Sequence, residues 1–136
     1  MSLEENKAVI RRLYDAFSTG DLSAMEDVLA ANAVDLARRE GQAPGIEGFK
    51  ERINEFRTGF PDLSITIETI VAEGDRVAEH AKLRGTHRGE FLGIPATGKQ
   101  VTAYMMGFNL LAESKIVERG RIIDFFGMMQ QLGRMP

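Results

Sequence analysis

In the first part of the chain apolar residues recur every three or four positions, which is the spacing of one face of a helix. Ser2 and Glu5 form an S-x-x-E capping box that predicts the start of a helix, and Gly20 ends it. A second, short helix is predicted to begin after Asp21, and a third to span residues 46–58. The predicted buried stripes are Val9, Ile10, Leu13, Tyr14 and Phe17; Leu22, Met25, Val28 and Leu29; and Ile46, Phe49, Ile53 and Phe56.

After Pro61 the apolar positions alternate with polar ones, which is the period of a half-buried strand. The predicted strands are a short one at 33–36, then 63–68, 77–84, 101–111 and 115–124, with a terminal helix at 125–132. Helices followed by strands with hairpin-length turns predict an α+β fold. We expect a single domain, residues 1–136, in which a curved antiparallel sheet and three N-terminal helices form a cone-shaped barrel around a pocket for one small ligand.

Composition narrows the function classes. The chain has 136 residues, 43% of them hydrophobic and 27% charged, with a net charge of −3 and no cysteine. Disulfides, thiolate metal sites and a cysteine nucleophile are therefore excluded. Scattered basic residues and a slightly acidic total argue against nucleic acid or an anionic membrane as a partner. We expect a cytoplasmic enzyme or binding protein, because no signal peptide or long apolar segment is recognisable.

Asp124 is the first candidate for chemistry, because it interrupts the apolar run 122–129. Burial in such surroundings raises the pKa of a carboxyl group, and a carboxyl that titrates near neutral pH can transfer protons. The alternative is that Asp124 caps the helix that follows. Glu118 is no partner for it, since six residues of regular strand separate the two by roughly 20 Å.

The two histidines are not expected to bind a metal together. His80 and His87 are seven positions apart, an odd spacing that places them on opposite faces of a strand. His87 alone is a candidate pocket acid or base, and the alternative is a structural hydrogen-bond donor. The chain has no phosphate-loop motif, no dinucleotide-binding glycine motif and no nucleophile-elbow serine.

Several segments, taken in order, resemble the SnoaL-like polyketide cyclases. They are residues 4–14, 20–22, 60–63, 72–77, 85–99 and 115–118, followed by Asp124 and by the ending 127–133. The resemblance implies a cone-shaped fold of the nuclear transport factor two-like superfamily. It also implies an intramolecular aldol ring closure without metal or organic cofactor, in which a pocket aspartate is the general acid/base. Asp124 matches that aspartate by position.

The chain departs from the family pattern at Leu36, Asn109, Arg119 and Gly120. We therefore keep two hypotheses. The first is a cofactor-independent cyclase or isomerase that acts on a small apolar carbonyl compound. In it Asp124 is the proton shuttle and His87 an assistant, and the predicted pocket side chains are Tyr14, Phe17, Phe56 and Met105. The second is a protein that binds a small hydrophobic ligand without chemistry. Epoxide hydrolysis or ketosteroid-type isomerisation on the same fold is a further enzymatic alternative.

The long predicted strand 101–111 is apolar on both faces. A strand of that kind is usually covered on both sides. We therefore expect a homodimer or higher homo-oligomer formed through the sheet.

Overall fold

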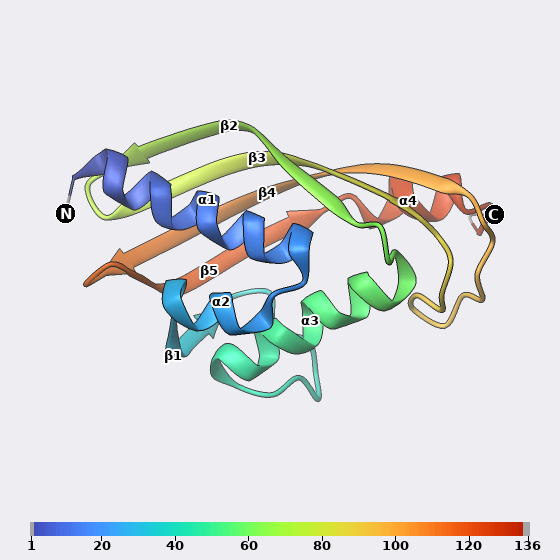
Figure 1. Cartoon of the computed structure of the whole chain (residues 1–136), viewed down its shortest axis with the longest axis horizontal. Helices are drawn as coiled ribbons and strands as arrows, with labels where there is room; N and C mark the ends of the chain where they lie inside the picture. The colour runs from blue at the N-terminus through green and yellow to red at the C-terminus, as the bar shows by residue number, and fades with distance from the viewer. Residues whose placement is uncertain (1, 135–136) are drawn as a thin grey trace.

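The computed structural model describes residues 2–134; Met1 and residues 135–136, which the single-domain prediction included, lie outside the described residues. The chain forms an α+β fold, as predicted, in which helices come first and a strand meander follows (Figure 1). The elements are α1 (Leu3–Thr19), α2 (Leu22–Val28), β1 (Leu29–Asp35), α3 (Gly45–Gly59), β2 (Ser64–Glu73), β3 (Arg76–Thr86), β4 (Gln100–Ala112), β5 (Lys115–Ile123) and α4 (Phe125–Gln131).

The sheet has the strand order β1-β5-β4-β3-β2. Its four later strands pair antiparallel, as predicted, but β1 joins the edge of β5 in parallel, so the sheet is mixed. The prediction also placed Leu29 in the second helix, whereas Leu29 is the first residue of β1. Both corrections concern one short segment, which is too brief for periodicity to separate the end of a helix from the start of a strand.

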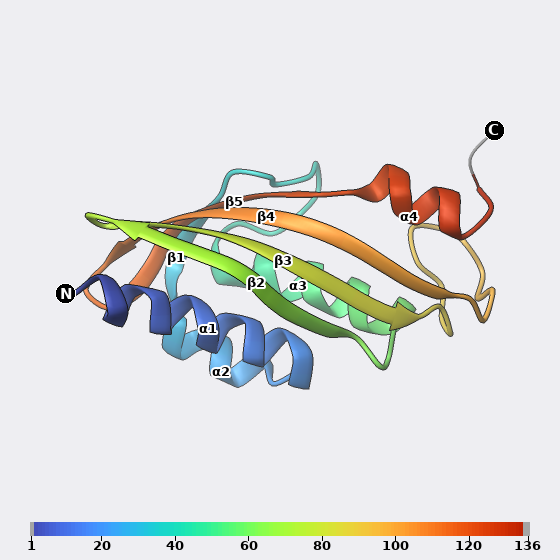
Figure 2. The same ribbon diagram turned by 90° about the horizontal axis from the view of Figure 1, so that it is seen from above.

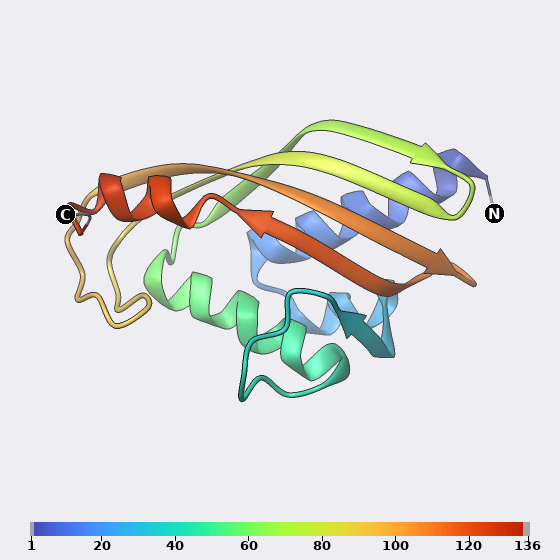
Figure 3. The ribbon, with the colours of Figure 1, turned by 180° about the vertical axis from the view of Figure 1, so that it is seen from behind.

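The sheet is curved, and α1, α2 and α3 lie on its concave side (Figures 1 and 2). α4 follows β5 at the far end of the sheet, seen clearly from behind in Figure 3. The buried apolar residues of α1, α3 and the inner sheet face form one core cluster. The described helices are too short or too polar to cross a bilayer.

The N-terminal helices begin and end where local sequence predicts. The amide of Glu5 donates to Ser2 Oγ at 3.0 Å, and the amide of Ser2 donates to Glu5 Oε1 at 3.1 Å, which completes the capping box. Gly20 adopts a φ of 75° at the end of α1, a conformation that glycine adopts without strain. Asp21 then accepts hydrogen bonds from two amides at the start of α2.

A β-bulge in β5 decides which side chains face the helices. Leu111 pairs with Ile116 and Leu110 with Glu118, so Val117 is an extra residue in this strand. As a result Ile116 and Arg119 are both buried although their spacing is odd. A strand without a bulge would place Ile116 on one face and Arg119 on the other. The bulge therefore brings Arg119 into the core.

Candidate functional site

An interior cavity of about 40 Å³ lies between α3 and the concave face of the sheet. Its lining side chains are Phe17, Phe49, Arg52, Ile53, Phe56, Ile65, Leu83, Met105, Arg121 and Ile123. Three of the four predicted pocket residues, Phe17, Phe56 and Met105, are among them. The volume is little more than the roughly 30 Å³ share of one water molecule, so a larger ligand must displace lining side chains.

Tyr14, the fourth predicted pocket residue, does not line this cavity. Its ring packs edge-on against Phe17, with the ring centroids 5.5 Å apart. Its hydroxyl accepts a hydrogen bond from Arg119 Nη2 at 3.1 Å. Tyr14 is thus one layer behind the cavity wall.

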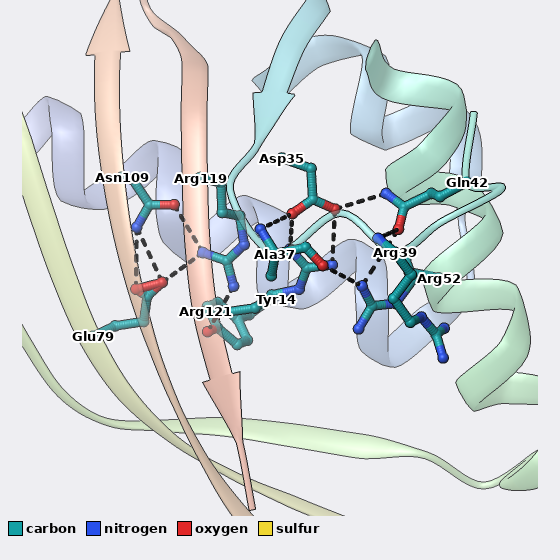
Figure 4. Close-up of polar contacts among 10 residues, drawn as sticks. All are labelled: Tyr14, Asp35, Ala37, Arg39, Gln42, Arg52, Glu79, Asn109, Arg119 and Arg121. Carbon is teal, nitrogen blue, oxygen red and sulfur yellow. Dashed lines mark hydrogen bonds and ion pairs between the residues drawn. The ribbon is translucent and has the colours of Figure 1, made fainter. Parts of the chain in front are cut away.

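Arg121 enters the cavity wall from β5 and is paired with Asp35, the last residue of β1 (Figure 4). The pair is bidentate, with Nη1–Oδ1 at 2.7 Å and Nη2–Oδ2 at 3.1 Å. Asp35 also accepts from the amide of Ala37 at 2.8 Å and from Gln42 Nε2 at 2.7 Å. Burial acts to raise the pKa of Asp35, but the hydrogen bonds from Arg121 and Gln42 outweigh it and hold that pKa below its ordinary value.

Arg52 is the second cation in the cavity wall, and it has fewer partners. Its Nη1 donates to the carbonyl oxygen of Ala37 at 3.1 Å and, at 3.4 Å, to Gln42 Oε1 (Figure 4). Its Nε is buried without a hydrogen-bond partner. Burial and the neighbouring cations Arg121 and Arg39 lower the pKa of Arg52 to about 10, so the side chain is still charged at neutral pH.

A separate network surrounds Arg119 deeper in the core (Figure 4). Arg119 Nη1 donates to Glu79 Oε1 at 2.6 Å and to Asn109 Oδ1 at 2.8 Å. The amide of Asn109 donates to both oxygens of Glu79 at 3.1 Å. Arg119 and Glu79 form an ion pair, and both side chains are fully buried. Burial acts to lower the pKa of Arg119, but Tyr14 and Glu79 outweigh it and raise that pKa above its ordinary value.

Asp124 is exposed, and its side chain accepts a hydrogen bond from the amide of Gly127 at 2.9 Å at the start of α4. The capping role considered for it is confirmed. The expectation that Asp124 is buried was wrong. The apolar run around it does not enclose it, because Ile122 and Phe126 in that run are also exposed. The cavity lining does not include Asp124, although it includes the preceding residue, Ile123. The predicted catalytic role of Asp124 stays a prediction.

His87 is fully buried but does not line the cavity. Its Nδ1 accepts from the amide of Thr97 at 3.2 Å and lies 3.0 Å from Thr97 Oγ1. The ring also packs on Phe60, with the centroids 5.5 Å apart. These contacts tie together the two ends of the glycine-rich loop between β3 and β4. The contacts are structural, as the alternative for His87 proposed, but Nδ1 accepts the hydrogen bond from the Thr97 amide and does not donate it. The predicted assisting role of His87 stays a prediction.

The four departures from the family pattern form two contacting pairs. Asn109 and Arg119 are opposite each other in the ladder and share a hydrogen bond. A Cβ added to Gly120 would approach Leu36 Cδ1 to 3.3 Å, so Leu36 lies over the space that the glycine leaves. Gly120 faces away from the interior cavity, so the space that it leaves is on the outer face of the sheet.

Arg52 and Glu79 were not predicted as site residues, although the sequence around each carries a signal. Arg52 occupies the same helical stripe as Phe49, Ile53 and Phe56, where a polar residue is out of place. Glu79 alternates in phase with the buried residues of β3. A charged residue in phase with a buried stripe is a reasonable sign of an internal ion pair or a binding group.

A mixed sheet wrapped around helices, with a small interior cavity, defines a cone-shaped α+β protein of the nuclear transport factor two-like kind. The chain belongs to the SnoaL-like polyketide cyclase family, whose model matches residues 7–132.

Solved structures agree with the family assignment. IdmH from Streptomyces antibioticus, provisionally assigned as a polyketide cyclase, is 32% identical, with a TM-score of 0.84 over 94% of this chain and 98% of IdmH. AclR from Streptomyces galilaeus, provisionally assigned as a hydroxylase, is 27% identical, with a TM-score of 0.87 over 99% and 100% of the two chains. TsrD from Streptomyces laurentii has a TM-score of 0.92 over 99% of both chains; at 23% identity it supports the fold alone. No curated protein sequence matches the chain.

Proposed function

We propose that the chain is a cyclase-type or isomerase-type enzyme that needs no cofactor and acts on a small, largely apolar carbonyl compound in the interior cavity. The observation that carries the proposal is an apolar cavity with two guanidinium groups in its wall, inside the fold of a cyclase family. Loss of a proton next to a carbonyl places negative charge on the carbonyl oxygen. A buried guanidinium close to that oxygen lowers the barrier, because it stabilises charge that develops in the transition state.

Asp124 is the proposed proton shuttle, abstracting the α-proton and returning it after the ring closes or the double bond moves. Its position supports this role in one respect. It directly follows Ile123, which lines the cavity, and it precedes Phe125, whose ring stacks on the cavity residue Phe56 with centroids 6.2 Å apart. A substrate that extends from the cavity toward α4 would approach the carboxylate.

Exchange of α-protons for deuterium in cyclohexanone, followed by NMR in D₂O, tests this role without the natural substrate. We expect the protein to accelerate exchange and Asp124→Asn to lose the acceleration while keeping its circular dichroism spectrum. Glu118→Gln is the control, since it removes a carboxylate from β5 near the β4–β5 hairpin, at the other end of the strand from Asp124. If Asp124→Asn exchanged at the parent rate, Asp124 would not be the shuttle.

The second candidate function is binding of a small hydrophobic ligand without chemistry. It is favoured by the cavity lining, which among the described residues includes no carboxylate. The nearby acids Asp35 and Glu79 are both held by arginines. If this function is the correct one, wild-type protein binds cyclohexanone and leaves the exchange rate unchanged. Assays with an epoxide and with a steroid enone separate the remaining enzymatic alternatives.

We also propose a homodimer formed through the outer face of the sheet. Large apolar side chains are exposed there on β2, β4 and β5: Val71, Tyr104, Met106, Phe108 and Ile122. An exposed apolar patch of this extent is typical of an interaction surface. Sedimentation equilibrium should give a dimer for the wild type and a monomer for Phe108→Glu. A wild-type protein that sediments only as a monomer contradicts this proposal.

A further inference from the structure

Arg52 is an unusual residue for its position on α3. It is 8% exposed and lies on the apolar stripe that packs toward the sheet, next to Ile53 and between Phe49 and Phe56. Holding a guanidinium in such a place costs free energy unless it is fully hydrogen-bonded or paired. The hydrogen-bond partners of Arg52 would have to offset this cost.

The partners present leave Arg52 incompletely satisfied. Its hydrogen bonds to Ala37 and Gln42 both come from Nη1, and its Nε is buried without a partner. Within the described part of the chain, Arg52 forms no ion pair with a carboxylate. The acceptors it does have are neutral, and the longer of the two contacts, at 3.4 Å, is a weak one.

Asp35 and Glu55 act on Arg52 through their charge, but neither forms an ion pair with it among the described residues. Both oxygens of Asp35 are taken up by Arg121, with further hydrogen bonds from Ala37 and Gln42. Arg39, also close by, is paired with Glu55 in a more exposed position. The described cavity lining therefore has two guanidinium groups and no carboxylate, and Asp35, just behind it, is paired with Arg121. One positive charge is left in excess.

We infer that Arg52 is the anion-binding side chain of the interior cavity, and that the natural ligand is a largely apolar small molecule with a carboxylate group. This inference rests on the proposal that the ligand enters this cavity. A carboxylate at Arg52 accepts from the guanidinium that lacks an acidic partner, and a charge-assisted bond of this kind is about twice as strong as a neutral one. The apolar body of the ligand then displaces lining side chains and packs among the cavity's aromatic rings, Phe17, Phe49 and Phe56.

Calorimetric titration with cyclohexanecarboxylate and its neutral amide, cyclohexanecarboxamide, tests the inference. The two probes have nearly the same shape and differ in charge. We expect the wild type to bind the carboxylate about tenfold or more tightly than the amide, as one charged hydrogen bond implies. Arg52→Met should abolish this preference. Arg12→Met is the matched control, because Arg12 is an exposed residue of α1 and its loss changes net charge equally.

Arg52→Gln is a second variant in case Arg52→Met does not fold, since glutamine keeps a donor for the carbonyl group of Ala37. Three results overturn the inference: equal affinity of the wild type for both probes, no carboxylate binding up to the solubility limit, or a preference that persists in the folded Arg52 variants. The titration does not depend on turnover. Failure of the α-proton exchange assay would therefore remove the proposed enzymatic function and leave the carboxylate preference standing.

Discussion

Two buried arginine clusters lie within the same fold, and they differ in how fully their charge is balanced. Arg119 has a carboxylate, an amide oxygen and a phenol as acceptors, all in the core, although its Nε, like that of Arg52, is buried without a partner. Arg52 has one carbonyl oxygen at ordinary distance, a weak amide contact and a cavity beside it. A buried cation paired with a buried carboxylate stabilises the fold only when both partners are in place. A cation that lacks a charged acceptor and lies next to a cavity can bind an acceptor group of a ligand.

Replacing Arg119 should produce the largest effect. Arg119→Met leaves the Glu79 carboxylate buried without its counter-ion, which costs about 3–5 kcal/mol of unfolding free energy. Urea denaturation followed by circular dichroism measures the loss. The double variant Arg119→Met/Glu79→Gln should recover part of it, because an amide is less costly to bury than an unpaired carboxylate. Equal stability of the single variant and the wild type would show that the pair is not structural.

Asp35→Asn should have the next largest effect, about 2 kcal/mol, because it removes charged hydrogen bonds to Arg121. The effect should depend on pH. The folded-state pKa of Asp35 is lowered, so its contribution is present above the unfolded-state pKa of about 4 and is lost as pH falls through the folded-state value. Thermal melts at pH 7 should therefore separate the variant from the wild type, and melts near pH 2–3 should bring the two together. A constant difference across this range contradicts the assignment.

Asp124 should contribute a smaller amount, of the size typical for a helix cap. Asp124→Ala should cost about 1 kcal/mol, while Asp124→Asn should be nearly neutral because asparagine also caps helices well. Thermal denaturation of the two variants gives both values. The pair of variants separates the cap from the proposed proton shuttle, since the shuttle is lost in both and the cap in only one.

Arg52→Met should have the smallest effect on stability, less than about 1 kcal/mol and of either sign. The lost hydrogen bonds are worth little, and the variant also removes the cost of burying an unpaired cation. Urea denaturation beside Arg119→Met makes the comparison direct. If Arg52→Met were as destabilising as Arg119→Met, both arginines would be structural and the difference between the clusters would disappear.

The order of elements was predictable because most of them carry strong local signals. The capping box at Ser2, the glycine at position 20 and the change of period after Pro61 each specify a boundary from neighbouring residues alone. The parallel pairing of β1 with β5 was not predicted, since it joins segments more than eighty residues apart. Pairing between segments so far apart in the sequence produces no periodic pattern in either one.

The candidate site was less predictable than the fold. Phe17, Phe56 and Met105 were predicted to shape the pocket, and all three lie in the cavity wall. Asp124 was expected to be buried because apolar neighbours in sequence were taken as neighbours in space. Ile122 and Phe126 instead face outward. The arginine clusters depend on which charged side chains meet across the core, and that information appears only once the strand register is known.

The bulge at Val117 has a consequence for how β5 tolerates changes in length. Deleting one residue within a strand normally exchanges its inner and outer faces. Val117 is the exception here, because Ile116 and Glu118 are already paired with the neighbouring residues Leu111 and Leu110. Removing Val117 would leave a continuous ladder with Arg119 and Arg121 facing as before. A deletion of Gly120 would instead shift the phase between Arg119 and Arg121, so two adjacent sites in one strand should differ sharply in the shortening they permit.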